Sequence, residues 1–130
     1  MAAKYKPFLT PEQYHVAYEG GTERAFSGKY WDNHEAGIYT SVASGVPLFS
    51  SKDKYDSGTG WPSFIRTLPD APVMEVTDTK YMMVRTEVKC SVDFVHLGHV
   101  FGDGPEPTGL RYCMNSAALN FIPQAEMSEE

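Results

Sequence analysis

The sequence predicts one mainly β domain, in which bent antiparallel sheets form a barrel-like or tent-like body preceded by short N-terminal helices. A chain of 130 residues allows one compact core and leaves little room for a second. Eleven Gly and nine Pro, with eight Tyr and seven Phe, are typical of short aromatic-rich strands separated by many turns. We treat residues 1–130 as a single domain with a core over about 9–123. Residues 1–8 and 124–130 are terminal extensions, and the acidic C-terminal one is expected to fray.

One helix is predicted near the N-terminus. Thr10 suits the N-cap, Pro11 suits the first helical position, and Gln13 can complete a capping box with Thr10. The Gly20–Gly21 pair then ends the helix. Three side chains are expected on its inward face: Tyr14, Ala17 and Tyr18.

The rest of the chain is expected to form strands joined by loops. Seven segments have the alternating or β-branched pattern of strands: residues 37–42, 47–50, 73–77, 81–89, 95–101, 110–114 and 119–122. Asp78 and Thr79 are predicted to form a turn between the third and fourth of these. Two long loops, 51–72 and 102–109, are rich in Gly, Pro, Asp and Ser.

The charge and the cysteine count exclude several classes of protein. The net charge is −6 at pH 7 and the isoelectric point is near 5.1, so nonspecific binding to nucleic acid or an anionic membrane is not expected. No apolar stretch approaches the ~20 residues of a membrane-spanning helix, and the N-terminus lacks the apolar segment of an export signal. Two cysteines cannot form a disulfide framework. We therefore expect a cytoplasmic monomer with reduced thiols.

Cys113 is the candidate nucleophile. Arg111 lies two residues before it and Asn115 two residues after it, so all three side chains project from one face of a predicted strand. A nearby guanidinium favours the reactive thiolate, and the Asn115 amide can orient a substrate or an imidazole. A buried core cysteine beside a structural arginine is the alternative interpretation.

His96 and His99 are separated by two residues, and Asp103 follows four residues later. Two imidazoles and a carboxylate so close along the chain could bind a metal or act as an acid–base relay. The same spacing also fits a pair of structural histidines. A Cys, a His and an orienting Asp or Asn are the components of an activated thiol, so this segment and the Cys113 segment support each other.

Trp61 lies in a glycine-rich loop, DSGTGWPSF, at residues 56–64. An exposed tryptophan there could hold a small apolar group, such as the methyl group of a thioether. The structural alternative is a core tryptophan that anchors the loop.

Two short pairs, Ser41 with Ser44 and Cys90 with Asp93, have the spacing of zinc-binding Cys pairs. Only one of the four is a cysteine, and neutral serines are poor zinc ligands. We therefore expect no zinc and no other cofactor, with packing and hydrogen bonds holding these two turns together.

Taken together, these segments resemble the methionine sulfoxide reductase B family, the peptide-methionine (R)-S-oxide reductases. The resemblance runs from about Leu9 to Pro123 in the family's order, through the motifs LTPEQYHV, GTERAFSGKYWDN, PLFSS, SGTGWPSF, VRTEV, HLGHVFGDGP and RYCMNSAALNFIP. It implies a thiol-dependent reductase that converts methionine (R)-sulfoxide, chiefly in proteins, back to methionine.

The resemblance also implies the roles of individual residues. Cys113 matches the catalytic cysteine, which attacks the sulfoxide sulfur and is left as a sulfenic acid. His99 matches the principal acid, with His96 assisting, and Asn115 matches a residue that lines the oxygen side of the pocket and helps to orient the histidine.

The same resemblance places three more side chains around the substrate. Trp61 matches the aromatic wall that holds the substrate methyl group. Asp103 and Arg111 match residues that tune the charge of the site.

Thr59 departs from the family pattern, because many metal-free members carry a resolving cysteine at this position. Cys90 is the only other thiol and is a candidate to form a disulfide with Cys113, although it matches a zinc-ligand position. Direct reduction of the sulfenic acid by an external dithiol such as thioredoxin is favoured.

Three alternatives stay open at this point. One is a metal-dependent oxygenase or hydrolase that uses His96, His99 and Asp103. Another is a non-enzymatic binding module with a reductase-like fold. The third is a reductase that acts mainly on free methionine sulfoxide.

Overall fold

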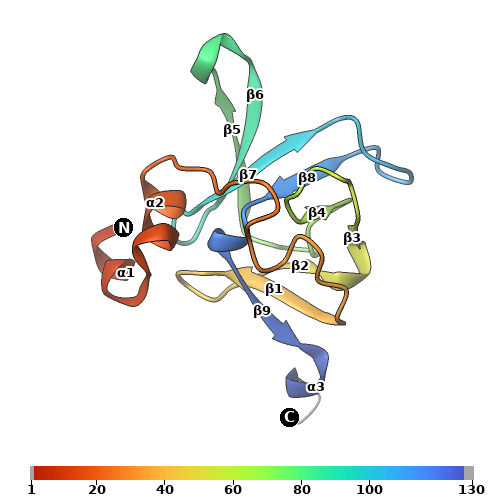
Figure 1. Cartoon of the computed structure of the whole chain (residues 1–130), viewed down its shortest axis with the longest axis horizontal. Helices are drawn as coiled ribbons and strands as arrows, with labels where there is room; N and C mark the ends of the chain where they lie inside the picture. Colours follow the sequence, from red (N-terminus) through yellow and green to blue (C-terminus); the bar gives the residue numbers. More distant parts are fainter. Residues whose placement is uncertain (1, 128–130) are drawn as a thin grey trace.

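Two antiparallel sheets form the body of the protein, and the computed structural model describes the chain over residues 2–127 (Figure 1). The smaller sheet has the strand order β2 (Pro47–Ser50), β1 (Gly37–Ser41) and β9 (Leu119–Pro123). The larger sheet has the order β3 (Lys54–Tyr55), β4 (Ser63–Phe64), β8 (Arg111–Met114), β7 (His96–Phe101), β6 (Arg85–Cys90) and β5 (Val73–Asp78). The predicted mainly β, antiparallel fold is confirmed, and within the described residues neither sheet closes into a barrel.

The predicted N-terminal helix is present as α2 (Pro11–Tyr18). The Gln13 N–H donates to Thr10 Oγ1 at 3.1 Å, and the Thr10 N–H donates to Gln13 Oε1 at 2.8 Å, which confirms the capping box. The fully buried residues of this helix are Val16 and Ala17, rather than the tyrosines of the predicted face. Ala17 faces inward as predicted and Tyr18 is partly buried against the core, so the inward face overlaps the predicted one and also includes Val16.

Short helical segments lie at both ends of the described chain. α1 (Ala2–Tyr5) and the 3₁₀ turn η1 (Lys6–Phe8) precede α2 and confirm the predicted N-terminal helices. α3 (Gln124–Met127) forms one helical turn where we expected a frayed end, while residues 128–130 lie outside the described residues. Among residues 2–127, no helix has the length and apolar character needed to cross a bilayer.

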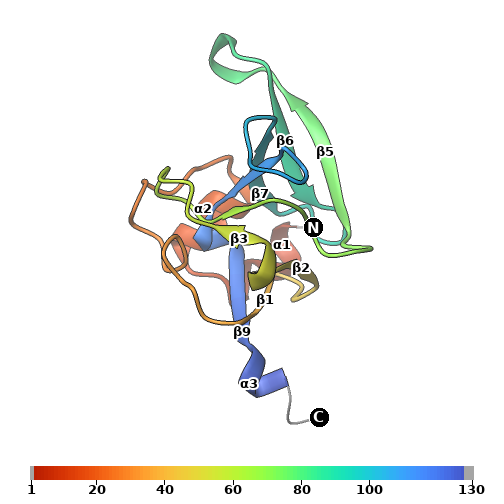
Figure 2. The ribbon, with the colours of Figure 1, turned by 90° about the vertical axis from the view of Figure 1, so that its right-hand side faces the viewer.

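Six of the seven predicted strands lie within one residue of their expected bounds. The exception is β6, which begins at Arg85 rather than at residue 81, because Lys80–Met82 form a 3₁₀ turn, η3. Tyr81 and Met82 there have φ of 59°, and a left-handed backbone cannot continue a strand. The β5–β6 hairpin consequently has a longer tip than predicted and projects from the body (Figures 1 and 2).

Four short elements were not predicted. β3 and β4 lie within the long loop 51–72 and contain two residues each, too few for a periodic pattern. The 3₁₀ turns η2 (Ser51–Asp53) and η4 (Ser116–Ala118) adjoin strands. η4 packs against α2 and follows the strand that carries Cys113.

An aromatic cluster joins the two sheets. Tyr39 of β1, Phe49 of β2 and Phe64 of β4 are all fully buried. The Phe64 ring is stacked on Phe49 with centroids 4.4 Å apart and meets Tyr39 edge-on at 5.1 Å. Burial of each such side chain stabilises the fold by about 1.5–3 kcal/mol. This core fixes the position of β4, which pairs directly with β8.

Candidate active site

β7 and β8 pair so that His99 lies directly opposite Cys113. Opposed residues of an antiparallel pair project from the same face, with Cβ atoms about 4.5–5.5 Å apart. Two residues further along, Phe101 lies opposite Arg111 on the same face. A Cβ atom on Gly98 would lie 2.1 Å from the Cys113 carbonyl oxygen, so glycine is required for this close approach of the strands. The candidate nucleophile and the candidate acid are therefore cross-strand neighbours.

A β-bulge in β7 brings His96 to the same face as His99. On a regular strand, residues three apart point to opposite faces. The register of β7 against β6 shifts between these histidines, leaving Leu97 as an extra residue. The two imidazole rings consequently lie 5.4 Å apart, centroid to centroid.

Each histidine is paired with its own carboxylate. The Nε2–H of His99 donates to Asp78 Oδ2 at 2.8 Å, and the Nδ1–H of His96 donates to Glu87 Oε2 at 2.6 Å. Asp78 also forms an ion pair with Arg85 at 3.2 Å. Because the acceptors are charged and largely buried, these contacts fix the orientation of both rings.

The pKa values of Asp78 and His96 are both lowered, for different reasons. The hydrogen bond from His99, followed by one from the Lys80 N–H, lowers the pKa of Asp78 to about 2. Burial lowers the pKa of His96, although Glu87 acts in the opposite direction. Asp78 is therefore ionised at neutral pH, and His96 is biased toward its neutral form.

Cys113 opens into a pocket of about 330 Å³. The side chains that surround the thiol there include Thr59, Trp61, His99, Arg111 and Asn115. The Trp61 indole N–H donates to the Glu23 carbonyl oxygen at 2.9 Å, which holds the indole against the pocket. The pocket lining thus combines an aromatic side chain with hydrogen-bonding groups.

Burial raises the pKa of the Cys113 thiol, while the Thr59 hydroxyl and the Arg111 guanidinium act to lower it. Arg111 is held in place by two contacts with Asp103, at 2.9 and 3.1 Å, and its guanidinium carbon lies 4.4 Å from the Phe101 ring centroid. Asp103 is exposed and is not among the pocket-lining residues, so it contacts the site through Arg111. Asp103 therefore affects the thiol indirectly, by holding the Arg111 guanidinium that acts on the pKa of Cys113.

The Asn115 amide is bonded to the backbone. Its Oδ1 accepts from the Glu23 N–H at 3.0 Å, and its Nδ2 donates to the Leu97 carbonyl oxygen at 3.3 Å. Leu97 is the bulge residue between the two histidines, so Asn115 holds the segment that carries both rings. The orienting effect expected from this residue therefore acts through the main chain.

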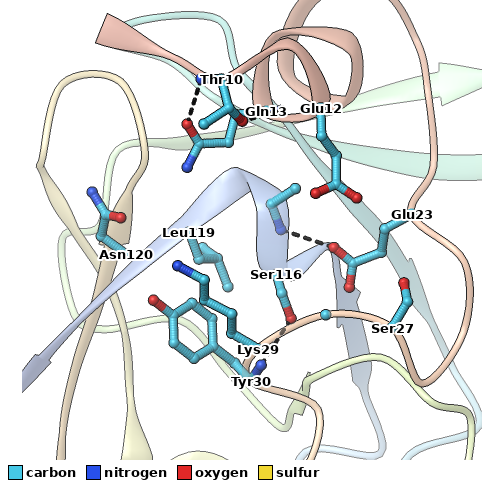
Figure 3. A pocket seen from close by; sticks show the side chains of 12 residues that line it. Thr10, Glu12, Gln13, Glu23, Ser27, Lys29, Tyr30, Ser116, Leu119 and Asn120 are labelled. Carbon is cyan, nitrogen blue, oxygen red and sulfur yellow. Dashed lines mark hydrogen bonds between the residues drawn. The ribbon is translucent and has the colours of Figure 1, made fainter.

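Glu23 is a site residue that the sequence did not single out. Its main chain bonds both Asn115 and Trp61, as described above, and its carboxylate accepts from the Ala117 N–H at 2.8 Å. Figure 3 shows this carboxylate beside Ser116 in a second pocket, behind the segment that follows Cys113. Burial raises the pKa of Glu23. Through its main chain, Glu23 therefore connects the N-terminal loop to Asn115 and to Trp61 of the candidate site.

Asp78, Arg85 and Glu87 were also not predicted. Charged residues alternate at positions 85, 87 and 89, which indicates one polar face on a strand. Only the strand register shows that this face is the one occupied by the histidines.

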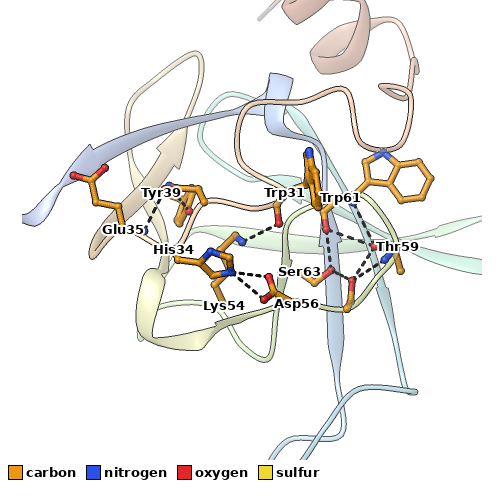
Figure 4. Close-up of polar contacts among 11 residues, drawn as sticks. Trp31, His34, Glu35, Tyr39, Lys54, Asp56, Thr59, Trp61 and Ser63 are labelled. Carbon is orange, nitrogen blue, oxygen red and sulfur yellow. Dashed lines mark hydrogen bonds and ion pairs between the residues drawn. The ribbon is translucent and has the colours of Figure 1, made fainter.

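The loop before β4 is braced by hydroxyl groups (Figure 4). Ser57 Oγ lies 2.9 Å from Thr59 Oγ1 and 2.7 Å from Ser63 Oγ, and Ser63 donates to the Trp61 carbonyl oxygen at 3.1 Å. Thr59 thus takes part in this network and also faces the Cys113 thiol.

Asp93 links the two turns that carry the zinc-like spacing. Its fully buried carboxylate accepts from Ser41 Oγ at 2.5 Å, the Ser44 N–H at 3.1 Å and the Val95 N–H at 3.0 Å. Burial acts to raise the pKa of Asp93, but these hydrogen bonds outweigh it, and the net shift is downward. Within residues 2–127 no group of three or more His, Cys, Asp or Glu side chains is arranged to hold a metal ion.

Cys90 and Cys113 lie on opposite faces of the large sheet. Cys90 is fully buried on the core face with Val88 and Met114, whereas Cys113 shares the polar face with His99. β7 lies between their strands, so their Cα atoms are at least about 10 Å apart across the sheet. A disulfide requires Cα atoms within about 7 Å. The suggested resolving role of Cys90 does not fit this arrangement.

Comparisons with known proteins agree with the family that the sequence motifs indicate. Residues 9–123 match the SelR domain family. A protein of Thiobacillus denitrificans named peptide methionine sulfoxide reductase MsrB is 59% identical over 122 residues, which cover 94% of this chain and 92% of that protein. The chain belongs to the methionine sulfoxide reductase B family.

Two further relatives extend this result. The family member of Herminiimonas arsenicoxydans is 52% identical over 127 residues, covering 98% of this chain and 93% of that protein. A Vibrio cholerae protein named peptide methionine sulfoxide reductase MsrA/MsrB is 56% identical over 94% of this chain, which spans only 32% of that longer protein. The match to the methionine sulfoxide reductase B family therefore extends over nearly the whole chain.

Proposed function

We propose that this protein reduces methionine (R)-sulfoxide residues in proteins to methionine and so repairs oxidative damage. The observation that carries the proposal is the cross-strand pair of His99 and Cys113, which faces a pocket with Trp61 on its wall. The relatives named as peptide methionine sulfoxide reductases support the same activity.

Cys113 is the nucleophile in the proposed reaction. Its sulfur attacks the sulfoxide sulfur and forms an S–S bond, while His99 donates a proton to the sulfoxide oxygen. The S–O bond of the substrate then breaks as this oxygen is transferred to the Cys113 sulfur, and the S–S bond breaks to release the thioether. The oxygen ends on Cys113 as a sulfenic acid, so that Cys113 loses two electrons and the methionine sulfur gains two. Acid catalysis of this kind contributes about 10²–10⁴-fold to the rate.

Asp78 and Glu87 contribute to this step by orienting the imidazole rings of His99 and His96. Asp78 binds Nε2 of His99, so the Nδ1 edge is the one left for the substrate. Because Asp78 is ionised at neutral pH, its contact with the Nε2–H of His99 is a charge-assisted hydrogen bond that fixes the ring. His96 is a neighbour within the same cluster and has a supporting role.

The shape of the pocket accounts for selection of the R epimer. The substrate methyl group rests against Trp61, and the oxygen points to the side that carries His99 and Asn115. The S epimer would direct its oxygen at the indole and leave polar groups unpaired, which costs about 1–3 kcal/mol or more.

Recycling of Cys113 requires an external thiol. Two equivalents of thiol, or one dithiol such as thioredoxin, convert the sulfenic acid to the thiol, releasing a disulfide and water. The position of Cys90 on the core face supports this route over an internal disulfide. Reduced thiols fit a cytoplasmic monomer without a bound cofactor, which is part of the proposal.

The decisive experiment supplies the separate R and S epimers of a methionine sulfoxide peptide with excess dithiothreitol. We expect turnover of the R epimer alone, none with Cys113→Ser, and unchanged turnover with Cys90→Ser. The same assay with free methionine sulfoxide tests the preference for peptides. Reduction of neither epimer, or retained activity in Cys113→Ser, would overturn the proposal.

A further inference from the structure

The most exposed apolar segment of the described chain is the hairpin tip, defined here as residues 79–84 between β5 and β6. Met82 is fully exposed, and Tyr81 and Val84 are each more than four-fifths exposed. Isolated exposed apolar residues are ordinary, but three within four positions at a projecting tip are not. No catalytic step described above uses them.

Met82 is the most exposed of the four methionines whose side chains the structure describes. Met83 is about half exposed, Met74 is partly buried, and Met114, directly after the nucleophile, is 1% exposed. A thioether is oxidised by peroxide when the oxidant can reach it, so solvent access favours attack at Met82 over Met114. Met114 is therefore an internal reference for any oxidation experiment.

The geometry of the hairpin makes oxidation at this position harmless to the fold. Asp78 and Arg85 form the last pair of the β5–β6 ladder, and Met82 lies beyond it in the 3₁₀ turn. A polar sulfoxide placed in solvent buries no unpaired group, whereas the same change in a core disrupts packing. The oxidised chain remains folded and can be recognised as a folded protein.

The hairpin tip also has a shape that suits binding to a methionine sulfoxide pocket, because its exposed methionine is at the end of a projecting turn. The hairpin projects from the body in both views (Figures 1 and 2). Tyr81 lines a pocket together with His96 and His99, whereas Met82 lines neither that pocket nor the one at Cys113. The pocket of a second copy is open to solvent beside Trp61 and Cys113. A protruding turn with a terminal methionine can enter such a pocket with little rearrangement.

We propose that Met82 is a site of oxidation and that its (R)-sulfoxide is reduced by a second copy of this protein. Hydrogen peroxide or a related two-electron oxidant transfers one oxygen to the Met82 sulfur and is itself reduced to water. Cys113 of the second copy then accepts that oxygen as a sulfenic acid and restores the thioether. This proposal rests on the proposed function, because it uses the same reaction on a different substrate.

The test uses full-length Cys113→Ser protein as the substrate, since it cannot repair itself. It is treated with hydrogen peroxide, freed of oxidant, and digested to locate added oxygen by mass spectrometry. We expect more sulfoxide at Met82 than at Met74 or Met83, with Met114 unmodified. Equal oxidation of Met82 and Met114 would overturn the assignment of the site.

The oxidised substrate is then incubated with a catalytic amount of wild-type protein and dithiothreitol, together with a separate (R)-sulfoxide peptide. We expect loss of about half of the Met82 sulfoxide, because peroxide forms both epimers and one enzyme acts on one epimer. Dithiothreitol alone and Cys113→Ser in place of wild type serve as controls.

The separate (R)-sulfoxide peptide distinguishes failure of this inference from failure of the proposed function. Reduction of the peptide without reduction of Met82 would overturn this inference and leave the proposed function intact, whereas reduction of neither would overturn both. A substrate with Cys113→Ser and Met82→Leu, oxidised in the same way, is the matched control. It should compete with the peptide several-fold less than the substrate that retains Met82.

Discussion

Asp78 and His99 lie 2.8 Å apart, although they are 21 residues apart in the chain and come from strands at different positions in the large sheet. β6 separates their strands, so the contact spans the width of one intervening strand. The carboxylate approaches the ring from the side of the β5–β6 hairpin, while Cys113 approaches from β8. His99 therefore sits between an ionised carboxylate and the candidate nucleophile.

Asp78→Asn tests this arrangement. The amide retains a hydrogen-bond acceptor but removes the negative charge of the partner that orients His99. We expect kcat for (R)-sulfoxide reduction to fall about 10–100-fold, within the usual range of acid catalysis, with a smaller change in KM. Single-turnover kinetics with the R epimer measures the step directly. Glu87→Gln is the matched control, since it alters the partner of His96, and an equal loss in both variants would argue against a special role for His99.

The acid limb of the stability curve should also depend on Asp78. Its folded-state pKa of about 2 lies below that of the unfolded chain, so its ionised form stabilises the fold above the unfolded value. That contribution is lost as the pH falls through about 2. Urea unfolding at pH 5 and at pH 2.5 should show a smaller decrease in free energy of unfolding for Asp78→Asn than for the wild type. Identical decreases would mean that the His99 contact does not persist in solution.

The reactivity of the Cys113 thiol should depend both on its burial and on the nearby Arg111 guanidinium. Because burial raises its pKa above the ordinary thiol value of about 8.5, alkylation by iodoacetamide should be slow at pH 7 and should rise through alkaline pH. Arg111→Met removes a group that lowers this pKa, so its profile should move to higher pH, with alkylation about 3–10-fold slower at pH 8. Asp103→Asn keeps the guanidinium and should change the profile less. Superimposable profiles for wild type and Arg111→Met would contradict this account.

The sequence predicted most of the strands because their signals are local. The capping box at Thr10 and the alternating segments each depend on residues close together in the chain. The bulge at Leu97 has no such signal, since a run of His-Leu-Gly-His reads as regular strand until the partner strand is known. The side chains of Asp78 and Glu87 reach the histidines only through strand pairing, so their roles follow from register rather than from a motif. The position of Cys90 on the core face is another such case, because residue spacing alone does not show which face of the sheet a side chain occupies.

Asp93 should contribute strongly to stability, because its buried carboxylate joins the two turns by hydrogen bonds. Asp93→Ala leaves Ser41 Oγ and the two backbone N–H groups without their acceptor in a fully buried position. We expect the free energy of unfolding to decrease by about 3–5 kcal/mol, as when one partner of a buried charged network is removed. Denaturant unfolding measures this, and elemental analysis of the wild type should find no stoichiometric zinc. Bound zinc, or a loss below about 1 kcal/mol, would contradict the interpretation.

Recycling provides the last test, because the two thiols of this chain face opposite sides of one sheet. With thioredoxin as the reductant, Cys90→Ser should turn over the R epimer within about twofold of the wild-type rate. After one equivalent of sulfoxide without reductant, both proteins should carry a sulfenic acid that a dimedone-type reagent labels at Cys113. Cys113 has Thr59 rather than a cysteine beside it, so no second thiol on the polar face of the described sheet can capture the intermediate. A Cys90–Cys113 disulfide in the wild-type protein, with loss of thioredoxin-dependent turnover in Cys90→Ser, would require the core strand β6 to open during each cycle and would overturn the proposed route.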